Sequence, residues 1–245
     1  MSKSPELRLA IHVMSHRRDV AIELSDELGY SLPEFREIAH LRESPLTVGQ
    51  RLRQALRVSE QEQRQWRNEW QAWRRWRAAV EDLGVLVFQF SDVSLQEARG
   101  VTLPLFPMPV IGINSQEPSA VARSFTLLRE LVYLALARAG EGNATLNGSR
   151  ADSERFAEET ASMVMIPQQM LTKSPRHGSF ASLPGKTLDL VGRPFVQLVL
   201  EALDANCITA VDACRYLDLR WDYVEKLRLE LRAGPADSPR SQPRR

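Results

Sequence analysis

The sequence contains little cysteine, little lysine and no long apolar run. Its two cysteines, Cys207 and Cys214, are seven positions apart, a spacing that predicts neither a disulfide framework nor a metal site. No apolar run approaches the roughly 18 residues that a membrane-spanning helix needs. No charged and then apolar leader opens the chain, so we expect a soluble, cytoplasmic protein. The net charge of +1 provides no overall field that would attract nucleic acid or a membrane.

What the sequence does contain is enough apolar material for a core: 43% of the 245 residues are hydrophobic and 26% are charged. Helical spacing of apolar residues alternates with two short β-branched runs, so we predict an α+β fold that is mostly helical. The expected helices are 5–29, 46–58, 59–82, 119–139, 152–166, 193–205, 209–217 and 221–232, and the expected strands are 85–90 and 110–114. A Pro-rich connection is expected between the two strands.

Segment 59–82 is the most aromatic part of the chain. As one helix, it would place Trp66, Trp70, Trp73 and Trp76 on one face, with arginines interleaved between them. Arginine beside tryptophan is also typical of surfaces that bind nucleic acid or a partner. Nothing else in the chain is basic enough to favour that alternative, so we interpret the tryptophans as core residues.

The stretch "SFTLLRELVYLALAR" (124–138) places Glu130 inside an apolar helix. Arg129 and Tyr133 flank it at a spacing of four residues. If both were histidine, the segment would read HELVH, the two-histidine motif of a zinc peptidase.

The order of segments around this helix resembles that of the ImmA/IrrE family of gluzincin-like metallopeptidases. The resemblance is carried by "RRWRAAVEDLGVLVFQF", "PVIGIN", "ARSFTLLRELVYLALARAG" and "SERFAEETASMVMIP". In the family, the helix after the "I.IN" strand carries the His-Glu-x-x-His motif, and the next helix adds a third metal-binding glutamate. The resemblance places Glu130 at the general-base position, Arg129 and Tyr133 at the two histidine positions, and Glu154 at the third-ligand position.

The resemblance also implies a division of the chain around a zincin-like core, in which a small sheet packs on the active-site helix. We expect a helical N-terminal region (1–82), the core (83–171), a loop (172–192), a helical C-terminal subdomain (193–232) and a disordered tail (233–245).

The residues at the metal positions predict that no zinc is bound. Arginine has no lone pair to offer, and tyrosine would ligate only as phenolate, which leaves Glu154 as the one suitable ligand. His12 and His16 are themselves four residues apart, but no motif glutamate accompanies them, and we interpret them as polar residues on an exposed helix face. His40 and His177 are expected to be structural or exposed.

We therefore expect Arg129 to replace the metal as a structural cation and to pair with Glu154. Intact relatives cleave or antagonise helix-turn-helix repressors of phages, mobile elements or stress responses. This chain is then expected to be a catalytically inactive regulatory module that binds a protein partner, either a repressor or the toxin of a toxin–antitoxin pair. The strand "VIGIN" is a candidate for pairing with an extended segment of that partner.

Two alternatives remain open at this point. One is a zinc-dependent endopeptidase with an altered metal site, in which Glu130 and Glu154 act with Tyr133. The other is a DNA-binding regulator, because residues 206–232 have a helix-turn-helix rhythm. The second helix of that unit carries three acidic and three basic residues, which gives no net attraction to phosphate, so a packing role is favoured.

Overall fold

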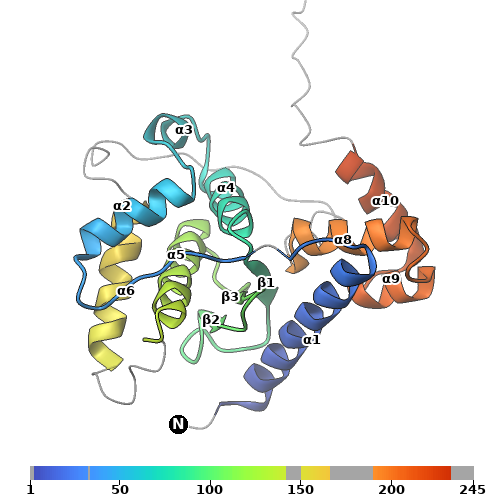
Figure 1. The fold of residues 1–245 in the computed structure, drawn as a ribbon, viewed down its shortest axis with the longest axis horizontal. Coiled ribbons are helices and arrows are strands. Elements are labelled where there is room, and N and C mark those ends of the chain that lie inside the picture. Colours follow the sequence, from blue (N-terminus) through green and yellow to red (C-terminus); the bar gives the residue numbers. More distant parts are fainter. Residues whose placement is uncertain (1–2, 33, 142–149, 166–189, 233–245) are drawn as a thin grey trace, which may run out of the picture.

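Helices and a small sheet make up the fold, as the sequence predicts (Figure 1). The computed structural model describes residues 3–32, 34–141, 150–165 and 190–232. The helices are α1 (Pro5–Glu27), α2 (Pro45–Ala55), α3 (Glu60–Arg64), α4 (Glu69–Glu81), α5 (Ala120–Arg138), α6 (Arg150–Met165), α8 (Arg193–Asp204), α9 (Ala210–Leu217) and α10 (Trp221–Arg232). The strands are β1 (Leu86–Phe90), β2 (Gly100–Leu103) and β3 (Val110–Asn114). Among the described helices, none is long and apolar enough to cross a membrane.

The sheet has the strand order β1-β3-β2, with β1 parallel and β2 antiparallel to β3. Strand β3 is therefore central and paired on both sides. The expectation that "VIGIN" pairs with a partner is wrong, because its backbone groups are already used by β1 and β2. Strand β2 lies where the sequence predicted a Pro-rich connection, and it is half-buried, whereas β1 and β3 are fully buried.

Two apolar cores lie on opposite faces of this sheet. Val87, Ile111 and Ile113 belong to the core that α2, α4, α5 and α6 complete. Phe88 and Val110 belong to the core that α1, α8, α9 and α10 complete. The alternation follows from the two-residue period of a strand. The helices of the expected N-terminal region therefore lie on both sides of the sheet (Figure 1).

The tryptophan segment forms two helices rather than one. The helix is interrupted between α3 and α4, where the Asn68 side chain accepts a hydrogen bond from the Gln71 amide and caps the start of α4. Trp73 and Trp76 are each 1% exposed. Trp66 packs against Trp76 with its ring centroid 5.5 Å away. The interpretation as core residues is confirmed for Trp73 and Trp76, whereas Trp66 and Trp70 are only partly buried and pack against that core.

The three C-terminal helices begin and end within one or two residues of their expected limits. A capping box between Thr209 and Asp212 starts α9, and Asp218 at φ 52° ends it. A three-residue turn, 218–220, then leads into α10, which gives the expected helix-turn-helix arrangement. Residues 172–189 of the expected loop and the tail 233–245 lie outside the described residues.

Candidate functional site

Helix α5 carries the candidate site at its middle. The Ser119 hydroxyl accepts a hydrogen bond from the Ala122 amide at the start of the helix, and Gly140, at φ 81°, follows its end. Apolar residues on both sides of Glu130, such as Leu128 and Leu131, are fully buried. The helix therefore buries the face that bears Glu130, although that residue is charged.

Glu130 is 4% exposed and is held by two neighbours. Its Oε2 accepts a hydrogen bond of 2.7 Å from the Thr102 hydroxyl of β2. Its Oε1 lies 3.1 Å from a guanidinium nitrogen of Arg129. Burial raises the pKa of Glu130, and the Arg129 charge and the Thr102 hydrogen bond oppose that rise.

Gly100, also in β2, makes room for this carboxylate. A Cβ at position 100 would lie 2.8 Å from Glu130 Cγ and 2.7 Å from Thr126 Cγ2, closer than real Cβ contacts. The sequence analysis missed Gly100 and Thr102 because it missed their strand. A glycine inside a short alternating apolar run such as "GVTL" is the signal that could have indicated both the strand and a close contact.

Tyr133 lies half-buried, one turn after Arg129. Burial raises the pKa of Tyr133 to about 12; the Arg129 charge opposes the rise, and the charges of Glu130, Glu154 and Glu158 add to it. The structure thus brings the four predicted site residues into one neighbourhood. Glu158, which the sequence analysis did not name, is one turn beyond Glu154 on α6.

The side chain of Arg129 is 23% exposed, and its ion pair with Glu130 is the pair that the structure shows. The guanidinium is always protonated, so it places a fixed positive charge beside a buried carboxylate. Its Nε is buried and makes no hydrogen bond with any described residue. Glu154 has an exposed side chain, and the predicted pair between Arg129 and Glu154 stays a prediction.

These residues do not fit a zinc ion. A catalytic zinc needs three protein ligands, and the described part of the chain contains no group of three His, Cys, Asp or Glu side chains placed to hold a metal. Burial raises the pKa of Tyr133 to about 12, which disfavours the phenolate form in which tyrosine would ligate a metal. Arg129 offers a cation only N–H donors and no lone pair, so it is not a ligand.

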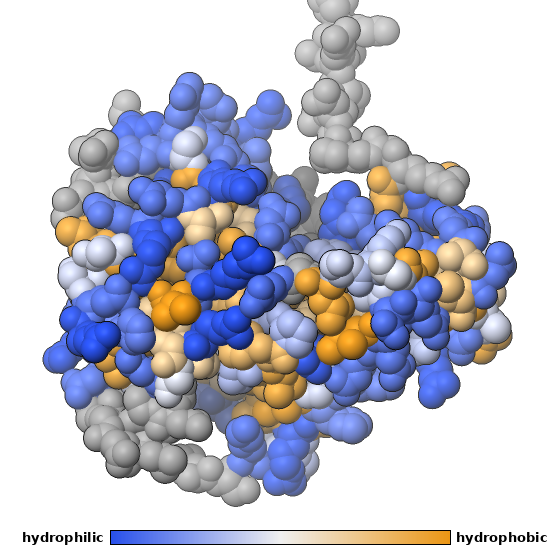
Figure 2. Space-filling model, in the orientation of Figure 1, coloured by the Kyte–Doolittle hydropathy of each residue, from blue (hydrophilic) through white to orange (hydrophobic). Residues whose placement is uncertain are grey.

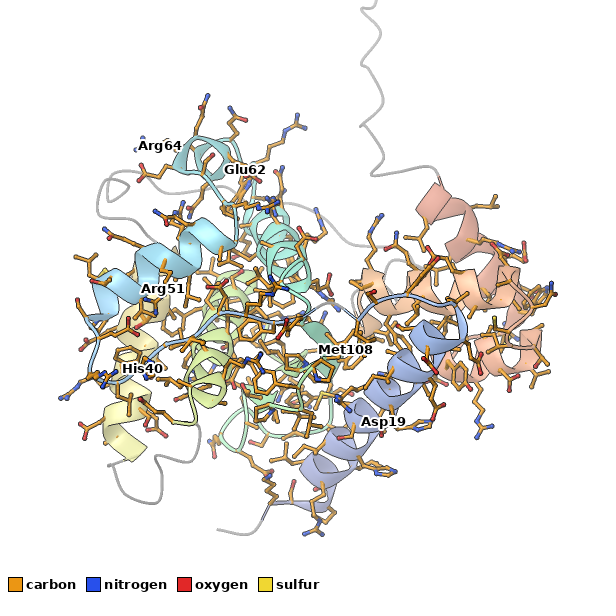
Figure 3. All side chains as sticks on the ribbon, in the orientation of Figure 1. Asp19, His40, Arg51, Glu62, Arg64 and Met108 are labelled. Atoms are coloured by element: carbon orange, nitrogen blue, oxygen red, sulfur yellow. The ribbon has the colours of Figure 1, made fainter. Side chains whose placement is uncertain are left out.

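The described histidines have contacts or exposure that do not involve this site. The Nδ1 of His40 lies 2.8 Å from Glu141 Oε1, a contact that ties the segment before α2 to the end of α5 (Figure 3). His12 and His16 are exposed on α1, as predicted. His177 lies outside the described residues.

The helix-turn-helix unit shows a packing face rather than a basic one. Val224 and Leu227 of α10 are fully buried against the neighbouring helices. The Lys226 ammonium lies 5.2 Å from the centre of the Tyr223 ring, and Arg228 forms ion pairs with Asp204 and Glu225. Because these cations already have neighbours within α10 and on α8, the geometry favours packing over binding to phosphate.

Comparisons of the chain with protein-family models, with curated proteins and with solved structures give no match. The interpretation of the site therefore depends on its own residues and on the order of segments in the sequence.

Proposed function

We propose that this protein is a catalytically inactive ImmA/IrrE-type pseudopeptidase that acts as a regulatory protein-binding module. The observation that carries the proposal is the ion pair between Arg129 and the buried Glu130. It lies where the family's first histidine and general base would be. The order of β1, β3, α5 and α6 around that pair supports a zincin-like core.

The pair explains how the scaffold keeps its shape without a metal. A buried carboxylate with no nearby positive charge is costly, and removal of the metal charge would leave Glu130 in that state. Arg129 supplies the missing charge, and Thr102 donates to the other carboxylate oxygen. A general base needs a metal-activated water to deprotonate, and with neither histidine present no such water would be held beside Glu130, so the base role is lost.

The partner is a helix-turn-helix repressor or a toxin, as the resemblance implies. Strand β2 supports this part of the proposal because it is an edge of the described sheet and lies directly beside Glu130. An extended segment of the partner would add to β2 by main-chain hydrogen bonds, the role first expected of "VIGIN". Fixation of Glu130 by Thr102 would keep that strand in place.

The metal content of tag-free protein tests the proposal. We compare two proteins that both carry His12→Ala and His16→Ala, so that these exposed histidines do not contribute zinc. With Arg129 and Tyr133 native, we expect no zinc. With Arg129→His and Tyr133→His added, we expect about one zinc per chain, because two histidines and Glu154 complete a three-ligand site. Stoichiometric zinc in the protein with native Arg129 and Tyr133 would overturn the proposal in favour of an endopeptidase with an altered metal site.

A further inference from the structure

His12 and His16 lie one turn apart on the solvent face of α1. Both side chains are exposed, and Asp19, one further turn along the same stripe, is exposed as well (Figure 3). The opposite side of the helix carries Met14, which is 1% exposed, and Ala21, which is fully buried. The two imidazoles therefore share one outward face, and no described element covers it.

Contacts on the inner side of α1 fix its rotation. Met14 packs so tightly on Gly112 of β3 that a Cβ at position 112 would lie 2.5 Å from the methionine sulfur. Arg18 Nε donates to the carbonyl oxygens of Met108, at 2.9 Å, and Leu105, at 3.1 Å. At the start of the helix, the Ser4 side chain accepts from the Leu7 amide. A helix held in this way presents its histidines on a rigid backbone, which lowers the entropic cost of bringing them together.

We propose that His12 and His16 chelate one divalent transition-metal ion, such as Zn²⁺ or Ni²⁺, between their imidazole nitrogens. Histidines at i and i+4 converge on one ion from a single helix face, and imidazole is a preferred ligand of both metals. Although Asp19 lies one turn further along, the described residues include no group of three His, Cys, Asp or Glu side chains that could hold a metal together. Water fills the other coordination positions, so the site is an exchangeable one.

This site is independent of the proposed pseudopeptidase site. Helix α1 contacts α8, β1 and β3, whereas Glu130 is on α5 and faces β2. Helices α1 and α5 belong to the cores on opposite faces of the sheet. Zinc found in the unaltered protein would therefore be expected on α1. The absence of a site on α1 would leave the argument from Arg129 and Glu130 unchanged.

Calorimetric titration of tag-free protein with Zn²⁺, repeated with Ni²⁺, tests the proposal. We expect one ion per chain, and binding at least about tenfold weaker after either His12→Ala or His16→Ala, because one of the two ligands is lost. The matched control is Val13→His with His16→Ser, which keeps the number of histidines but makes the pair adjacent. Adjacent residues on a helix do not face each other, so this control should bind as weakly as the alanine variants.

Far-UV circular dichroism of each variant checks that α1 remains folded. Equal affinity in the unaltered protein and in the adjacent-histidine control would overturn the proposal, because it would show adventitious binding to single histidines only. Tight binding that survives both alanine substitutions together would overturn it as well and would locate the ion elsewhere.

Discussion

At the scale of single residues, the placement of Arg129 decides how the candidate site is understood. Residues at i and i+1 of a helix do not normally face each other, and the resemblance, which puts Glu154 at the third-ligand position, made that residue the expected partner of Arg129. In the structure, the guanidinium reaches Oε1 of its neighbour Glu130, while the predicted pair with Glu154 stays a prediction. The Glu130 side chain lies against Gly100, where a larger residue would clash with it, and its Oε1 is 3.1 Å from the guanidinium. The spacing of residues along α5 cannot show this arrangement, because the space beside Glu130 is provided by Gly100 on strand β2.

The substitution Arg129→Ala should destabilise the protein by about 2 to 3 kcal/mol, because it leaves a buried carboxylate without its compensating charge. Urea unfolding at pH 7 measures the loss. The control is Arg155→Ala, which breaks a surface pair whose side chains are 72% and 59% exposed and should cost less than about 0.5 kcal/mol. Equal losses in the two variants would show that the Arg129 pair is no more than a surface contact.

The destabilisation caused by Arg129→Ala should shrink as the pH falls from 7 to about 5. Burial raises the folded-state pKa of Glu130 above its unfolded value, and removal of the arginine raises that pKa further. The folded state then holds a proton that the unfolded state has lost, so stability falls as the pH rises through this range. Below the folded-state pKa values of the native protein and the variant, Glu130 is protonated in both folded proteins, so the missing cation has little effect on stability. A pH-independent difference would contradict this account.

At the scale of elements, the contact between β2 and α5 is what the sequence pattern could not provide. Helix α5 follows from its apolar spacing and its capping serine, which are local signals. Strand β2 is four residues long and half-buried, and it forms because it pairs with β3 and covers Glu130. Those partners are distant in the sequence. The break between α3 and α4 was missed for a related reason. Residues 65–68 continue the pattern of polar and apolar residues expected of a helix, but Asn68 caps the start of a new helix and so interrupts the helical spacing.

The substitution Gly100→Ala tests that contact. The added Cβ would meet Glu130 Cγ and Thr126 Cγ2, and overpacking of this kind typically costs about 1 to 3 kcal/mol. The same substitution in a Glu130→Ala background should cost clearly less, because the shorter side chain leaves space for the methyl group. Unfolding of the four proteins of this double-mutant cycle gives the coupling between the two positions. A coupling near zero would place Glu130 away from β2.

At the scale of the whole molecule, a buried polar cluster joins the two cores. Arg77 and Glu81 of α4 form an ion pair of 3.0 Å in which the side chains are 6% and 7% exposed, and Arg77 also donates to the carbonyl oxygen of Val87 in β1. Gly192, just before α8, lies against this cluster. The two candidate sites lie on opposite sides of the sheet, because α5 and α1 belong to different cores. The face seen in Figure 2 is mainly polar, with apolar areas across its middle. The relative position of the two sites therefore depends on this junction.

Gly192 and Gly140 offer a test of the junction, because both have φ of 81° but only Gly192 lies against the cluster. Gly192 also has ψ of 147°, a backbone region that is essentially restricted to glycine, so an alanine there bears a backbone cost of about 1 to 3 kcal/mol. An alanine at Gly140, in the turn that ends α5, bears a cost of about 1 kcal/mol. At Gly140 nothing lies within 4 Å of the added Cβ, so that cost is the whole effect. At Gly192 the Cβ would lie 2.7 Å from Glu81 Oε1 and 3.0 Å from the Val87 oxygen. Because the contact adds to the larger backbone cost, we expect Gly192→Ala to cost at least about 1 kcal/mol more than Gly140→Ala in urea unfolding. Equal costs would show that α8 does not dock on the Arg77–Glu81 pair, and the two cores would then be joined through the sheet alone.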